Sequence, residues 1–145
     1  MDRERCAIPY SLFDGETLPF LDGEFDCVSF IDVLHHTDDP ASLIREAARV
    51  SGRYVVIKDH VSRNRFDRSV LSFMDWVGNR SYGVRLNYNY LGSRRWQEVF
   101  ATCGLVMAEK TARLGLYPFP LSLLFERGLH FLVLLEKAKA PQTSV

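Results

Sequence analysis

The sequence predicts an α/β fold with a doubly wound, mostly parallel sheet and an antiparallel strand at its edge. Residues 25–31 and 54–57 are short apolar runs joined by a single helix-length segment, and such a short crossover favours a parallel pair. Two later apolar runs, 105–112 and 129–135, predict a strand pair. We expect one domain over residues 1–137, followed by a frayed tail over 138–145.

The first elements lie around an acidic turn. Residues 8–13 predict a short strand that ends at the turn dipeptide Asp14-Gly15. Residues 25–31 then predict a strand buried on both faces, because five of the seven side chains are apolar. On this strand Cys27 is expected to be a small core residue.

A helix should connect the two parallel strands. Asp38 or Asp39 can cap it, with Pro40 at its first position, and Gly52 is expected to end it. Its predicted buried face consists of Leu43, Ile44, Ala47 and Val50.

The second half should contain two more helices. Over residues 65–77 the predicted core-facing stripe is Phe66, Val70, Phe73, Met74 and Val77, with Asp75 on the surface. Residues 79–92 are glycine- and tyrosine-containing and predict a loop packed by its own aromatic rings. Ser93 can cap the next helix, which Gly104 ends.

Charge, cysteine spacing and the N-terminal residues indicate which partners and which compartment to expect. The chain has 18 basic and 18 acidic residues, so nothing indicates a nucleic-acid or anionic-membrane partner. Its three cysteines are widely spaced, which fits reduced thiols better than disulfides or a zinc site. The charged start, MDRERCAIPY, is unlike a signal peptide, so a cytoplasmic protein is the default expectation.

Polar residues follow both parallel strands, where ligands bind in open α/β sheets. The run from Asp32 to Asp39 follows the first strand, and Lys58, Asp59 and His60 end the second. No metal is expected here, because adjacent ligands rarely converge on one ion. His60 can serve as a general base or simply as a hydrogen-bonded strand end, and both interpretations stay open.

Together these segments resemble a known family. The stretch FDGETLPFLDGEFDCVSFIDVLHHTDDP, the strand YVVIKDH, and the later MDWVGN and RRWQEVFATCGL are similar to class I S-adenosylmethionine-dependent methyltransferases of the small-molecule type 11 group. The resemblance implies a Rossmann-like sheet in the order three, two, one, four, five, seven, six, with the seventh strand antiparallel. It implies transfer of a methyl group from S-adenosyl-L-methionine to a small molecule.

The resemblance also implies site residues. Asp14 and Gly15 would contact the adenine of the cofactor, while Asp32, Leu34 and His35 would lie near its methionine end. His36, Asp59 and His60 would border the acceptor pocket and supply the catalytic groups.

One family motif is missing. No GxGxG or GxG occurs in the sequence, although the family's glycine-rich first turn cradles the methionine end of the cofactor. We therefore expect an N-terminally truncated domain with impaired activity, whose first strand, residues 25–31, self-associates through an unpaired edge. The alternative is a non-catalytic binding or partner module.

Overall fold

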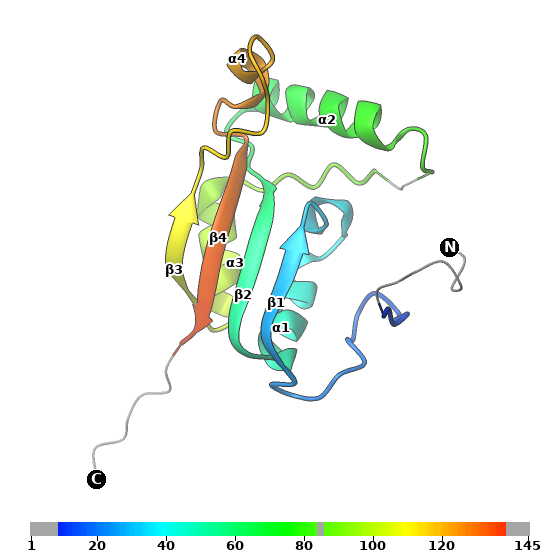
Figure 1. The fold of residues 1–145 in the computed structure, drawn as a ribbon, viewed down its shortest axis with the longest axis vertical. Helices are drawn as coiled ribbons and strands as arrows, with labels where there is room; N and C mark the ends of the chain where they lie inside the picture. The colour runs from blue at the N-terminus through cyan, green and yellow to red at the C-terminus, as the bar shows by residue number, and fades with distance from the viewer. Residues whose placement is uncertain (1–8, 84–85, 139–145) are drawn as a thin grey trace.

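The structure is a computed structural model that describes residues 9–83 and 86–138. It contains one sheet with helices against it (Figure 1). In chain order the elements are β1 (Phe25–Ile31), the 3-10 helix η2 (Leu34–His36), α1 (Pro40–Val50), β2 (Ser51–His60), α2 (Arg65–Asn79), α3 (Ser93–Thr102), β3 (Leu105–Thr111), α4 (Ser122–Phe125) and β4 (His130–Lys137).

The sheet is mixed and has the order β1-β2-β4-β3. Strands β1 and β2 are parallel, whereas β4 is antiparallel to both of its neighbours, β2 and β3. The predicted α/β class is confirmed, and the order corresponds to strands four, five, seven and six of the expected sheet. The antiparallel strand lies one place inside the edge, because β3 packs outside it.

Helices α1 and α3 lie on the same face of the sheet, behind it in Figure 1. The core between these layers is apolar, with Ile44, Val55, Ile57, Trp96 and Leu135 among its buried side chains. Helix α2 instead crosses the end of the sheet where β1 and β2 finish (Figure 1). That end is where the polar residues gather.

Helix α1 forms as the sequence predicts. The Asp39 carboxylate accepts hydrogen bonds from the backbone N–H groups of Ala41 and Ser42, and Pro40 occupies the first turn. The predicted apolar face is buried. The predicted end was wrong, since Gly52 lies inside β2, which begins directly at Ser51.

Strand β1 is less buried than predicted. Val28 and Phe30 pack against the core, but the alternate side chains, including Cys27 and Ile31, are exposed. The expectation of two buried faces was wrong because β1 is an edge strand of the described sheet, with α1 on one face. The expected open edge is therefore present in the described residues.

Helix α2 turns a different face inward from the one predicted. Phe66, Phe73 and Val77 are exposed, while Asp67 and Asp75 are buried beside Val70 and Leu71. The apolar-stripe prediction holds for Val70 and Met74, which pack in an apolar cluster. It was wrong for the other three residues, because Asp75 meets polar partners at the end of the sheet. Its hydrogen bond and ion pair determine which face of the helix is buried.

Other predictions concern irregular segments. Residues 9–13 form no strand, and Ile8 lies outside the described residues, as do 139–145 of the predicted tail. The loop prediction holds for residues 80–83 and 86–92, where Tyr90 is buried against Tyr88. Gly92, rather than Ser93, is the N-cap of α3.

Candidate active site

The candidate site lies at the carboxyl ends of β1 and β2. Asp32 follows β1, and its backbone N–H donates to the carbonyl of Lys58 on β2, 2.9 Å away. Strand β4 begins at the same end, since His130 is directly opposite His60 in the β2–β4 register. Three strands thus deliver polar side chains to one place.

Asp59 is the centre of the hydrogen-bond network and is fully buried. One carboxylate oxygen accepts from the backbone N–H of Leu34 at 3.0 Å. The other is 2.7 Å from His35 Nδ1 and 2.7 Å from the backbone nitrogen of His60. Burial opposes ionisation of this carboxyl, but the hydrogen bonds from His35 and His60 hold its pKa well below the usual range.

His35 forms the next layer of the network. Its Nε2 lies 3.4 Å from a carboxylate oxygen of Asp75, which also accepts a hydrogen bond from the Tyr90 hydroxyl. Burial alone would lower the pKa of His35, but the bonds to Asp59 and Asp75 outweigh it and raise the pKa to about 9. His35 is therefore a buried cation between two carboxylates at neutral pH.

This network determines what each predicted residue can touch. Asp59 and the Leu34 side chain are fully buried and do not line either of the two cavities described below. His35 is 1% exposed and forms the back of a cavity wall. His36 and His60 lie closer to the cavity that a substrate could enter.

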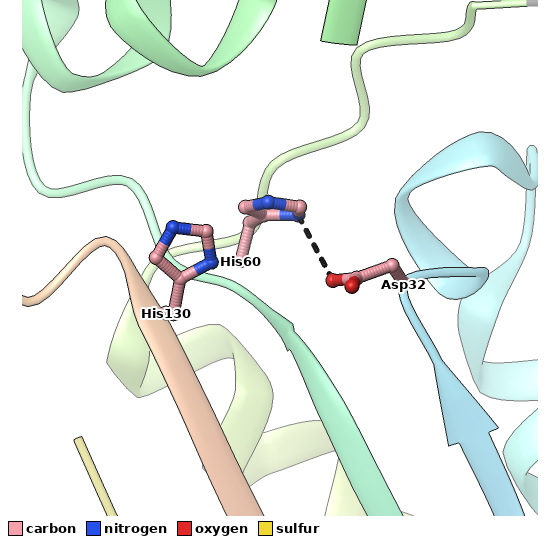
Figure 2. A group of neighbouring side chains, drawn as sticks. All are labelled: Asp32, His60 and His130. Atoms are coloured by element: carbon pink, nitrogen blue, oxygen red, sulfur yellow. Dashed lines mark ion pairs between the residues drawn. The ribbon is translucent and has the colours of Figure 1, made fainter. Parts of the chain in front are cut away.

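A second polar group lies at the mouth of the site (Figure 2). The ring of His60 lies between the ring of His130 and the carboxylate of Asp32. Asp32 also forms an ion pair with Lys58. Its backbone φ of 53° is in the left-handed region, which Asp tolerates better than most residues.

Asp14 and Gly15 form a separate turn, which lines a cavity together with His36. The Asp14 carboxylate accepts hydrogen bonds of 2.8 Å from the backbone N–H groups of Glu16 and Thr17, and these bonds lower its pKa. Gly15 has a φ of 89°, which glycine adopts without strain. The turn borders a cavity of about 450 Å³ that reaches Asp39 and Asn87.

The polar cluster borders a different cavity of about 230 Å³. Its walls include Asp32, Lys58, His60, Tyr117 and His130. His36 lines both cavities, and it is only half-buried. The two cavities therefore share one imidazole ring as part of their walls.

Sequence reasoning missed several members of the site. The helical periodicity predicts a surface position for Asp75, and no sequence pattern predicts a role for Tyr90, Tyr117 or His130. His130 pairs with His60 only through the strand register, and no spacing in the sequence predicts that register. A charged residue within an apolar helical repeat, as Asp75 is, was the one signal available.

The fold and the position of this site, at the carboxyl ends of parallel strands, are those of a Rossmann-like α/β domain. Residues 2–55 match the profile of the family described as "Methyltransferase domain". The comparison with curated proteins finds no match. The expected resemblance to class I, type 11-like methyltransferases is thus confirmed.

Solved structures share the fold. An S-adenosylmethionine-dependent methyltransferase from Mesorhizobium loti matches with a TM-score of 0.62 and 13% identity, over 92% of this chain and 71% of that one. Magnesium protoporphyrin IX methyltransferase from Synechocystis, with bound SAH, matches with a TM-score of 0.53 and 14% identity, over 87% of this chain and 49% of that one.

The fold alone does not fix the reaction. The [4+2]-cyclase SpnF also matches, with a TM-score of 0.56 and 14% identity, over 90% of this chain and 56% of the cyclase. The chain spans about half the length of the protoporphyrin methyltransferase and the cyclase. Its reaction must be argued from its own site.

No helix in residues 9–83 and 86–138 combines the length and the apolar character that crossing a membrane requires.

Proposed function

We propose that the chain binds S-adenosylmethionine and transfers its methyl group to a small molecule. The observation that carries this proposal is that His36 lines two cavities, one bordered by the Asp14 turn and the other by the ends of β1 and β2. Cavities of about 450 and 230 Å³ suit a nucleoside-sized ligand and a small acceptor.

The Asp14 turn fits the adenine end of the cofactor. Because the pKa of Asp14 is lowered, its carboxylate is ionised at neutral pH and can accept a hydrogen bond from an exocyclic amine. Gly15 has no Cβ, and open space surrounds the position that a Cβ would occupy, so a flat ring can approach. Asp32, Leu34 and His35 remain proposed neighbours of the methionine end.

The bound cofactor would supply a methyl group on a sulfonium, and the residues of this chain would orient the acceptor for in-line attack. An acceptor hydroxyl must also lose a proton. His36 is our first candidate for the proton acceptor, because burial and the charge on His35 lower its pKa and keep it neutral. His60 is the second candidate, and Asp59 positions it through the backbone.

Cofactor binding should be weak. Since the sequence holds no glycine-rich turn, the polar partners that such a turn supplies are missing. Losing several hydrogen bonds of about 1 kcal/mol each lowers affinity by roughly two decades or more. Calorimetric titration of the chain with S-adenosylmethionine tests this, and low-micromolar binding would refute the expected impairment.

Replacing Asp14 tests the adenine site. Asp14→Ala should weaken cofactor binding about tenfold while leaving the fold unchanged, because the residue lies on an exposed turn and its carboxylate acts on the ligand. Glu109→Ala, an exposed carboxylate on β3, is the matched control and should bind as the unmodified chain does. Equal affinity in both variants would remove Asp14 from the site.

The proton acceptor can be tested by turnover. With an acceptor found by screening hydroxyl compounds for release of S-adenosylhomocysteine, His36→Asn should lower turnover about a hundredfold with little change in cofactor affinity. If only His60→Asn has this effect, the roles are reversed. If neither does, the chain supplies no proton acceptor.

A second candidate function is a non-catalytic partner module. The observation that favours it is β1, an edge strand that exposes Ile31 and Cys27. A partner chain could add a strand there. Methyl transfer by the purified chain alone would exclude a purely non-catalytic role.

A further inference from the structure

We propose that Asp32, His60 and His130 form a binding site for one divalent transition-metal ion, of the chemistry of Zn²⁺. One ligand atom from each residue lies within 4.8 Å of those of the other two. The three residues follow β1, end β2 and begin β4, so the sheet register brings them together although they are far apart in the sequence (Figure 2). This proposal does not rest on methyl transfer.

His130 gives an independent reason to expect a ligand. Its side chain is 4% exposed and lines the 230 Å³ cavity, yet neither ring nitrogen has a hydrogen-bond partner within the described residues. Buried polar atoms are almost always paired, because leaving one unpaired costs free energy. A metal ion bound to one of these nitrogens would supply the missing interaction.

The ligand set also suits such an ion. Two imidazoles and a carboxylate bind Zn²⁺ and leave a fourth position open for water or a substrate. Bound ligand atoms would lie about 3.4 Å apart in a tetrahedral site, so the three side chains need to close by roughly 1 Å. Asp32 is at the partly exposed mouth of the cavity, so its carboxylate has room for this movement once the Lys58 ammonium is displaced.

His60 is held in place for this role. Its backbone N–H donates to Asp59, and its carbonyl accepts a 3.0 Å hydrogen bond from the indole of Trp96. The Asp59 carboxylate also lies 3.4 Å from His60 Nδ1. An ion bound through His60 Nε2 would leave Nδ1 to the Asp59 carboxylate, and a carboxylate at the second nitrogen of a ligating histidine fixes its ring and strengthens metal binding in known sites.

The Lys58 ammonium group already provides a positive charge beside the Asp32 carboxylate at this site. Its ammonium group pairs with Asp32 and is largely buried. A metal ion must displace this ammonium to reach the carboxylate, so Lys58 competes with the ion. Removing Lys58 should therefore tighten metal binding, which a merely structural ion pair would not predict.

A second grouping, of His35, His60 and Asp75, also brings ligand atoms within 4.8 Å. We favour the first grouping because His35 already bonds to Asp59, and Asp75 already accepts from Tyr90. An ion there would have to replace these bonds.

The test is titration of the full chain with Co²⁺, followed by its visible absorption, and with Zn²⁺, followed by calorimetry. We expect one ion per chain. Asp32→Asn and His130→Gln should each weaken binding by at least about tenfold, and Lys58→Met should strengthen it. His36→Gln is the matched control, because His36 lines the same cavity outside the proposed ligand set, and it should leave the affinity unchanged.

Three results would overturn the proposal. They are the absence of binding below about 1 mM of either ion, unchanged affinity in Asp32→Asn, and an equal loss in His36→Gln. If His130→Gln fails to fold by circular dichroism, Asp32→Asn decides alone, because Asp32 is partly exposed and Asn tolerates its left-handed backbone.

Discussion

Replacing Asp59 by asparagine is expected to destabilise the chain by about 3 kcal/mol, because it leaves the buried His35 cation with one carboxylate fewer. The same carboxylate also accepts from the backbone N–H of Leu34, which ties η2 to the end of β2, and from the backbone N–H of His60. Urea unfolding followed by tryptophan fluorescence measures the change. A loss of this size is a large share of the stability of an ordinary domain.

The control for this prediction is an exposed ion pair. Glu98 pairs with Arg94 on the outer side of α3, at 3.0 Å, and both side chains are exposed. Glu98→Gln should leave the free energy of unfolding nearly unchanged, because solvent screens an exposed ion pair. If Asp59→Asn is as mild as Glu98→Gln, then the buried network does not stabilise the packing of η2 against β2.

The isolated chain is expected to self-associate through β1. In the described sheet only β2 pairs with β1, so its other edge keeps unpaired backbone groups, and the exposed Ile31 and Phe25 side chains add apolar surface. Edges of this kind are templates for association. Light scattering should show oligomers whose size increases with concentration.

Lysines on β1 should reverse this behaviour. Cys27→Lys combined with Ile31→Lys places charges on exposed positions of the strand and should give a monodisperse monomer. Val106→Lys is the matched control, because Val106 is exposed on β3, at the opposite edge of the sheet. A stable monomer of the unmodified chain would mean that the β1 edge does not drive self-association.

The sequence predicted the fold where local signals and tertiary packing agree. Helix α1 has a cap, a first-turn proline and an apolar face, and all three are found as expected. Helix α2 shows the opposite case, because the apolar periodicity that includes Phe66 and Phe73 conflicts with the pairing of Asp75 to His35. Periodicity cannot weigh a buried ion pair against an apolar stripe.

The same limit applies to the site. The order of motifs placed Asp32, His36, Asp59 and His60 at one end of the sheet, as the structure has them. It could not distinguish a buried positioning residue such as Asp59 from a side chain that faces the cavity. Nor could it place His130, whose position depends on strand register.

The most direct test of the central claim is an NMR titration of the ¹⁵N-labelled chain, carrying Cys27→Lys and Ile31→Lys, with S-adenosylhomocysteine. The claim is that the Asp14 turn and the ends of β1 and β2 form one ligand site that meets at His36. It predicts that the amide resonances of Gly15 and His36 shift together with one apparent affinity, while those of Val106 and Glu109 on β3 stay fixed. Shifts confined to other elements, or none at millimolar ligand, would contradict it.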